Sequence, residues 1–237
     1  MAKGTVYMLP NTLGGEQLSD IIPNDIISII SDLRYFIVED LRSARRFLRK
    51  ADRSFPIDDS TFYELNKHTN RGDISTYLKP CMEGKNLAVI SEAGCPGVAD
   101  PGGSIVAEAH KMGIPVKPLV GPNSILMTLM ASGFSGQEFS FHGYLPKDRK
   151  DRIKVLKQME MDVHRSGVTH LFMDTPFRNM NVLEDLLNEL ADHTELCIAS
   201  NITLSSERIN TMSVKEWREK AYDLSKSPTM FALGKSV

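Results

Sequence analysis

Cysteines and long apolar runs are both scarce in this chain of 237 residues. The three cysteines stand far apart and form no Cys-x-x-Cys pair, which excludes zinc-finger spacing and a thioredoxin-like redox motif. Their small number is typical of a reduced, cytoplasmic protein. No stretch reaches the roughly 18 apolar residues that a membrane-spanning helix needs. We therefore expect a cytoplasmic protein with no membrane partner.

An excess of either sign of charge is also missing. The chain has 28 Lys and Arg residues against 30 Asp and Glu residues, for a formal net charge of −2. This balance excludes a polycation that binds nucleic acid by overall charge, although it leaves a local basic patch open. The composition, 41% hydrophobic and 24% charged, is that of a globular protein and excludes a mainly disordered chain.

Several familiar motifs of nucleotide-binding and hydrolytic enzymes do not occur. No two glycines stand two residues apart, so the Gly-x-Gly-x-x-Gly fingerprint is impossible. The Gly-Lys-Ser triplet that starts at Gly234 lacks the upstream glycine of a P-loop. There is no His-Glu-x-x-His or Gly-x-Ser-x-Gly motif and no cluster of metal-ligand spacing, so we expect no metal.

What the sequence does contain is an alternation of short apolar runs with helix-length amphipathic segments. This pattern predicts β-α units and mostly parallel sheets. The expected strands are 5–9, 35–38, 86–91, 116–120, 170–174, 196–199 and 229–233. The expected helices are 42–51, 105–112, 124–131, 151–159 and 181–189. Because Gly121 and Pro122 interrupt regular structure, we expect two α/β domains, residues 1–117 and 118–237, each with its own sheet.

Glycine and polar residues gather directly after the expected strands. The strongest example is the segment 91–103, which holds four glycines and two prolines between a strand and a helix. Glycine lets a ligand approach the main chain, and ligands of open α/β sheets bind beyond the carboxyl ends of strands. Such loops would converge on one cleft. A long structural turn is the alternative, and composition alone does not decide between the two.

Two basic stretches interrupt the otherwise balanced charge. Arg42, Arg45, Arg46, Arg49 and Arg53 fall near one face of the helix expected at 42–51. The second stretch, 147–157, contains six basic residues. Each stretch by itself is typical of a solvated face, but together they segregate positive charge and favour an anionic substrate, since Arg is well suited to bind phosphate.

These segments resemble those of the tetrapyrrole-methylase-type (class III) S-adenosylmethionine-dependent methyltransferases. Within that superfamily the chain most resembles the small-subunit ribosomal RNA 2′-O-methyltransferase I family. The segments that carry the resemblance are 39–46, 91–103, 121–124, 141–147 and 174–178. The resemblance implies two α/β domains with a cofactor cleft between them, S-adenosylmethionine as cofactor, and a homodimer. It also accounts for the missing Gly-x-Gly-x-x-Gly, which this class does not use.

The resemblance also implies particular site residues. The cofactor would contact residues in both halves of the chain: Leu13, Gly94, Cys95, Val98, Ser124, Ile125, Met173, Ala199 and Thr229. The substrate would contact Arg42, Arg45, Arg46 and His68. A ribose 2′-hydroxyl must lose its proton during methylation, and the candidate bases are Glu39, Asp40, Glu92 and Asp100. The sequence does not rank these acids.

Departures from the family pattern leave three functions open. Where the family has Arg, Glu and Lys after an alanine, this chain has Ser200, Asn201 and Leu204. The first function is a methyltransferase for ribosomal RNA, which the basic stretches favour. The second is a methyltransferase for a small, tetrapyrrole-type molecule. The third is a non-catalytic RNA-binding protein that retains the fold.

Overall fold

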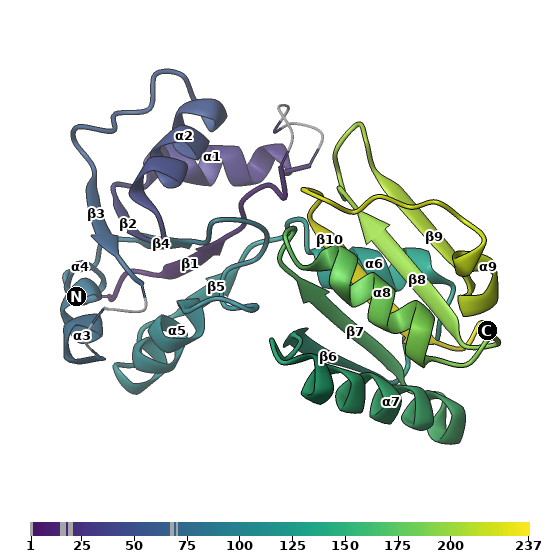
Figure 1. Ribbon diagram of the computed structural model, residues 1–237. Helices are drawn as coiled ribbons and strands as arrows, with labels where there is room; N and C mark the ends of the chain where they lie inside the picture. Colours follow the sequence, from purple (N-terminus) through teal and green to yellow (C-terminus); the bar gives the residue numbers. More distant parts are fainter. Residues whose placement is uncertain (1, 15–17, 19–20, 67–68, 70) are drawn as a thin grey trace. The chain divides into compact units, whose positions relative to one another are not determined.

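The computed structural model describes residues 2–14, 18, 21–66, 69 and 71–237. It contains two compact units, Met1–Asn123 and Ser124–Val237, and each unit has its own sheet (Figure 1). The sequence predicts a boundary after residue 117, whereas the first unit includes the segment that follows its last strand and contains Gly121 and Pro122. No helix in the described ranges is long and apolar enough to cross a membrane.

The first unit is built on a five-stranded sheet in which every pair of neighbouring strands is parallel. Its order is β3-β2-β4-β1-β5, formed by β1 (Val6–Leu9), β2 (Tyr35–Val38), β3 (Thr61–Glu64), β4 (Leu87–Ile90) and β5 (Val116–Pro118). The helices are α1 (Asn24–Asp32), α2 (Leu41–Ala51), α3 (Ile74–Tyr77), α4 (Lys79–Met82) and α5 (Gly102–Lys111), with a 3-10 turn at Arg71–Asp73.

Helices cover both faces of this sheet, so its three central strands β2, β4 and β1 are apolar on both sides. Successive side chains of a strand point to opposite faces. In β2, Phe36 and Val38 therefore join the core under α1 and α2, while Ile37 joins the core under α3 and α5. Burial on both faces is why these three strands appear in the sequence as continuous apolar runs, whereas the edge strands β3 and β5 are partly exposed.

The second unit has a mixed sheet of order β6-β7-β10-β8-β9. Its strands are β6 (Phe139–Tyr144), β7 (Thr169–Asp174), β8 (Glu195–Ser200), β9 (Arg208–Ser213) and β10 (Thr229–Gly234). The helices are α6 (Ser124–Ser132), α7 (Arg149–Ser166), α8 (Asn179–Glu189) and α9 (Val214–Arg218). Only β6 and β7 pair in parallel, so the expectation of a mostly parallel sheet is wrong here. The cause is that β8 turns back into β9, and β10 then enters between β7 and β8.

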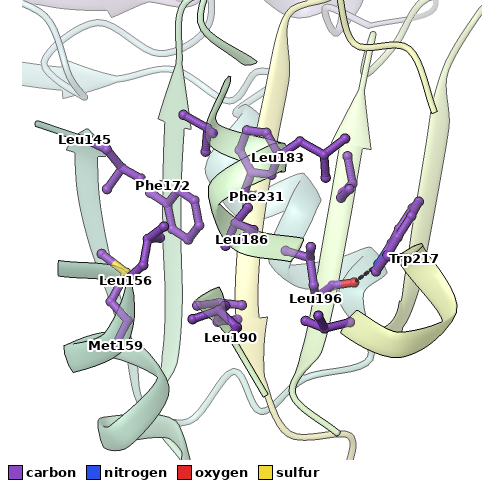
Figure 2. Packing of buried hydrophobic residues seen from close by; sticks show 14 of the residues in the cluster. Leu145, Leu156, Met159, Phe172, Leu183, Leu186, Leu190, Leu196, Trp217 and Phe231 are labelled. Atoms are coloured by element: carbon purple, nitrogen blue, oxygen red, sulfur yellow. Dashed lines mark hydrogen bonds between the residues drawn. The ribbon is translucent and has the colours of Figure 1, made fainter. Parts of the chain in front are cut away.

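Large apolar side chains fill the space between this sheet and its helices (Figure 2). The rings of Phe172 and Phe231 stack with their centres 5.5 Å apart on neighbouring strands. Leu183 and Leu186 of α8 pack in the same cluster. Trp217 is fully buried, and its indole Nε1 donates a hydrogen bond of 2.8 Å to the main-chain oxygen of Leu196. Toward the carboxyl ends of β6 and β7 the pairing shifts register between Phe141 and Tyr144.

Candidate active site

Three loops of the first unit meet at the carboxyl edge of its sheet. The strands β4, β1 and β5 are neighbours, and each leads into one of the loops. Asn11, in the loop after β1, is buried and its Nδ2 donates hydrogen bonds to the main-chain oxygens of Ser91 (3.1 Å) and Glu92 (3.0 Å). The Asn11 main-chain N–H donates to the oxygen of Gly94 at 2.9 Å. The loop after β1 is therefore fastened to the glycine-rich loop after β4.

The segment after β5 completes this arrangement through a close approach of Gly121 to Pro10. A Cβ atom on Gly121 would lie 2.2 Å from the Pro10 Cβ, so only glycine fits there without a shift of the main chain. The Cys95 thiol donates to the main-chain oxygen of Pro122 at 3.4 Å. Burial raises the pKa of Cys95 above its usual value, which keeps this thiol neutral.

Gly94 lies where the three loops come together. Its φ of +70° is strained for any residue with a side chain. A Cβ atom there would stand 3.2 Å from Leu13 Cδ2 and 3.4 Å from the Pro122 oxygen. The structure thus brings Leu13, Gly94 and Cys95 together, and Val98 follows as an exposed residue of the same loop. This cradle of main chain and small apolar side chains fits a nucleoside-type cofactor.

Asp100 acts within the glycine-rich loop as a clamp. Its Oδ1 accepts hydrogen bonds from the main-chain N–H groups of Gly97 (2.7 Å) and Gly102 (2.6 Å). Its Oδ2 is buried and has no hydrogen-bond partner in the described part of the chain. Asp100 Oδ1 therefore stabilises the turn that leads into α5, and only Oδ2 is left without a structural hydrogen bond from the described residues.

Glu39 and Asp40, both candidate bases, lie in different surroundings. Asp40 caps α2, because its Oδ1 accepts a 2.7 Å hydrogen bond from the Ser43 N–H, and this bond holds the pKa of Asp40 below its usual value. Burial raises the pKa of Glu39, and the carboxylates of Glu92 and Asp100 raise it further, although a hydrogen bond from the Glu92 N–H opposes the shift.

Glu39 also lines a small cavity at the edge of the sheet. The cavity has a volume of about 10 Å³, and Ser91 and Asp100 line it as well. This volume is no larger than a single water molecule, and most of the residues that line the cavity are apolar. The Glu39 carboxylate is therefore half-buried at the edge of the apolar core, which is the surrounding that raises its pKa.

The arginines expected to bind substrate lie on α2, which begins three residues after Val38, the last residue of β2. Arg42, Arg45 and Arg46 are all exposed, and the Arg45 guanidinium lies 5.4 Å from the centre of the Phe62 ring. No carboxylate of the described residues lies within 4.0 Å of any of the three. Their charges are available to a ligand. His68 lies outside the described residues.

The remaining expected cofactor residues belong to the second unit. Met173 and Ala199 stand opposite Met230 on either side of β10, which places both beside Thr229 at one edge of the sheet. Ala199 is fully buried, and Ser124 and Ile125 form the first turn of α6. The structure thus gathers Met173, Ala199 and Thr229 within this unit.

Asp174 and Arg178 fasten two loops of the second unit together. An Arg178 Nη2 lies 2.9 Å from Asp174 Oδ2, and the same nitrogen donates to the main-chain oxygens of Leu145 (3.1 Å) and Pro146 (3.0 Å). The loop after β6 is therefore held against the turn after β7. The sequence predicts no role for this pair or for Asn11, although segment 174–178 carries part of the family resemblance and all three residues lie in or next to the loops that follow expected strands.

Most of the second basic stretch is ion-paired, so only part of it is open to the anionic substrate that the sequence favours. Arg149 and Arg152 both donate to the buried carboxylate of Asp185 at 2.7 Å, and Arg152 is itself buried. Lys154 pairs with Asp151 at 3.2 Å, and Lys157 pairs with Glu189 at 2.8 Å. The contacts to Asp185 and Glu189 hold α7 on α8, whereas the Lys154–Asp151 pair lies within α7. Among the described residues, Lys147 and Lys150 of this stretch have no carboxylate within 4.0 Å.

Known proteins are similar to this chain in sequence and in fold. The model of the family Tetrapyrrole (Corrin/Porphyrin) Methylases matches residues 24–217. The Ribosomal RNA small subunit methyltransferase I of Vibrio cholerae is 29% identical over 214 residues, which are 89% of this chain and 69% of that protein. The protein of the same name from Thermotoga maritima is 30% identical over 177 residues, which are 75% of each.

Among solved structures, the crystal structure of the methyltransferase CobJ superposes with a TM-score of 0.63. It covers 100% of this chain and 95% of its own, at 19% identity, so it demonstrates the shared fold. The two-unit α/β architecture expected from the resemblance is therefore confirmed. With a family model that extends over most of the chain, the protein belongs to the tetrapyrrole (corrin/porphyrin) methylases and is a methyltransferase.

Proposed function

We propose that this chain methylates ribosomal RNA, with S-adenosylmethionine as the methyl donor and a ribose 2′-hydroxyl as the acceptor. The observation that carries the proposal is the convergence of three loops around Gly94, with Glu39 accepting a hydrogen bond from the Glu92 N–H of the glycine-rich loop. Relatives named for ribosomal RNA methylation, at 29% and 30% identity, support the substrate. Such a substrate implies action in the cytoplasm.

When bound, S-adenosylmethionine supplies an activated methyl group on a sulfonium. The chain's own task is to align the acceptor oxygen with that group and to keep water out. The cradle around Gly94 would hold the cofactor, with Leu13, Cys95 and Val98 as its apolar wall. In the second unit, Met173 and Thr229, with Ser124, Ile125 and Ala199, are the residues we assign to the same cofactor.

Glu39 is the acid best suited to accept the proton of the 2′-hydroxyl. Its raised pKa brings it nearer to the working pH, and a general base is most effective when its pKa lies there. Asp40 is engaged in the cap of α2, and one oxygen of Asp100 is engaged in the glycine-rich loop. These contacts favour Glu39 over Asp40 and Asp100 as the catalytic base. It is also favoured over Glu92, the fourth candidate, whose side chain is exposed to water.

Arg42, Arg45 and Arg46 would bind the phosphates of the RNA. A cluster of positive charge beside the cofactor would repel its sulfonium, whereas each phosphate that an arginine neutralises favours binding of the RNA backbone. Arginine also offers a planar set of donors that matches phosphate geometry. We therefore assign these three side chains to the substrate and not to the cofactor.

The cofactor assignment is tested by Gly94→Val. The added side chain would meet Leu13 and the Pro122 oxygen and fill the cradle, so binding of S-adenosylmethionine in a calorimetric titration should be lost. Gly167→Val is the matched control, because Gly167 has a similar φ of +76° but no atom within 4 Å of its Cβ position. Unaltered binding by a folded Gly94→Val chain would contradict the assignment.

We also propose that the chain forms a homodimer. Leu126 and Met130 lie one turn apart on α6 and are both exposed, with 83% of Met130 accessible. Apolar side chains that recur at this spacing form a stripe that a second helix can cover. A second copy of the chain is the partner that we assign to this stripe.

A further inference from the structure

Two aromatic side chains stand exposed at the carboxyl edge of the second sheet. Tyr144 ends β6 and is 59% exposed, and Phe177 follows β7 and is 91% exposed. The two strands are parallel neighbours, and after a bulge in β6 Tyr144 pairs with Met173, just before the turn that carries Phe177. The two side chains therefore lie at the same edge of the sheet, Tyr144 at the end of β6 and Phe177 in the turn after β7.

The turn that carries Phe177 is held firmly on both sides. Before it, Asp174 Oδ1 accepts a 2.7 Å hydrogen bond from the Thr175 N–H. After it, Arg178 binds Asp174 and the oxygens of Leu145 and Pro146, which belong to the loop after β6. Phe177 is thus presented to solvent by a rigid support and is not tucked into the core, although its burial would be favourable.

Positive charge accompanies the two rings. Lys147 lies three residues after Tyr144, and Lys150 is in the first turn of α7; both are exposed. Neither has a carboxylate within 4.0 Å among the described residues, in contrast to the ion-paired Lys154 and Lys157 further along α7. The one acid between them, Asp148, accepts a hydrogen bond from the Asp151 N–H as the cap of α7.

We propose that Tyr144 and Phe177 stack on two nucleobases of a single-stranded segment of the RNA substrate, with Lys147 and Lys150 on its phosphates. Exposed aromatic rings beside unpaired basic side chains are the usual elements of single-strand recognition, because every base offers a flat face for stacking. The inference rests on the proposed function only in taking RNA as the substrate. It assigns the binding of bases to the second unit, in addition to the phosphate contacts proposed for α2 in the first unit.

The test is the affinity of the full chain for a short fluorescent single-stranded RNA, measured by anisotropy. Tyr144→Ala and Phe177→Ala should each weaken binding about tenfold, the usual order for loss of one stacked base, without changing the salt dependence. Phe177→Trp should retain binding. The double variant Lys147→Ala with Lys150→Ala should instead make the slope of log K against log salt concentration less steep, by about 0.7 for each phosphate that is no longer neutralised. The control is Phe139→Ala, since Phe139 is 41% exposed at the other end of β6.

Wild-type affinity in both aromatic variants, or an equal loss in Phe139→Ala, would overturn the inference. A change from dimer to monomer in Phe177→Ala, with unchanged RNA affinity, would assign the ring to a protein contact and overturn it as well. The proposed function is judged separately, by methyl transfer. If RNA binding depends on both rings but the RNA is not methylated, the inference stands and the proposed function is refuted. If a Phe177→Ala chain keeps full RNA affinity and methylates the RNA, the proposed function stands and the inference is refuted.

Discussion

Glu39 and Asp40 are neighbours in the chain, yet the fold shifts their pKa values in opposite directions. The Asp40 carboxylate receives the Ser43 N–H and stabilises the start of α2, so its pKa is lowered. The Glu39 carboxylate is partly removed from water and lies near two other acids, so its pKa is raised. One side chain is therefore structural and the other is left with the properties of a base.

This difference predicts a pH-dependent effect of Glu39→Gln on stability. Because the folded-state pKa of Glu39 lies above 4.5, its ionisation disfavours the folded state, and the wild type should lose stability relative to the variant as pH rises above 4.5. Urea unfolding at a series of pH values measures the difference. The same variant should lose about 10²–10⁴-fold in methyl transfer.

Asp40→Ala provides the contrast. Loss of this cap should lower the free energy of unfolding by about 1 kcal/mol near neutral pH, and the loss should shrink as pH falls below 3.8, where the wild-type carboxylate also becomes protonated.

If Glu39→Gln and wild type kept a constant difference in stability across the whole pH range, the raised pKa of Glu39 would be refuted.

The sequence could identify these acids but not rank them. Glu39, Asp40 and Asp100 all follow strands and all look equally available in the chain. Their roles depend on how closely main-chain N–H groups reach each carboxylate. The nitrogens of Ser43, Gly97 and Gly102 lie 2.6–2.7 Å from Asp40 or Asp100, whereas that of Glu92 lies 3.4 Å from Glu39. Such contacts are set by the local path of the loop, which residue type and spacing do not specify.

At the scale of elements, α2 carries the charge that the proposed substrate requires. Replacement of Arg42, Arg45 and Arg46 by alanine should weaken RNA binding. It should also make the slope of log K against log salt concentration less steep, by about 0.7 for each phosphate that the arginines had neutralised. The affinity for S-adenosylmethionine should stay nearly unchanged. A triple alanine variant of Lys154, Lys157 and Arg165 is the control, because it removes equal charge from side chains that pair with acids.

Two outcomes would contradict this role of α2. If the arginine triple variant folded but no longer bound the cofactor, these side chains would belong to the cofactor site. If its RNA binding equalled that of the control triple variant, α2 would present a solvated face and the substrate assignment would lose its charge-based support. A thermal unfolding scan must accompany both variants, since Arg45 also packs over Phe62.

The sequence predicts buried elements of this fold well and exposed or mixed ones poorly. All seven expected strands and five expected helices are present, because each buries an apolar face. The edge strands β3, β6 and β9 escaped prediction, since their residues are exposed or half-exposed. Helix α1 was hidden by its run of isoleucines, a composition typical of strands, although Ile26 and Ile30 are buried at helical spacing. The ion pairs of α7 were also out of reach, because Asp185 lies more than 30 residues away from Arg149 and Arg152 in the chain.

At the scale of the whole molecule, the sequence supports two units but not the topology of the second. An apolar run predicts a strand and says nothing of its direction, so β10 could not be recognised as antiparallel to both of its neighbours. The order of strands and the exposed stripe on α6 emerge only from the fold.

The proposed homodimer makes a direct prediction for that stripe. Met130→Glu places a charge on an apolar contact, so the chain should sediment as a monomer at concentrations where the wild type is a dimer. Met161→Glu is the matched control, because Met161 is also exposed, at 56%, but lies on α7. A monomeric wild type, or a Met130→Glu chain that remains dimeric, would refute the assignment of this stripe.

The central claim, that this methyltransferase acts on ribosomal RNA, is tested most directly by following the methyl group. The purified chain is incubated with methyl-labelled S-adenosylmethionine and small-subunit ribosomal RNA that lacks the modification, and the RNA is digested to nucleosides for mass spectrometry. We predict label in a 2′-O-methylated nucleoside, and its loss in the Glu39→Gln variant. A folded wild-type chain that binds S-adenosylmethionine but transfers no label to the RNA, or that labels a tetrapyrrole in its place, would contradict the account.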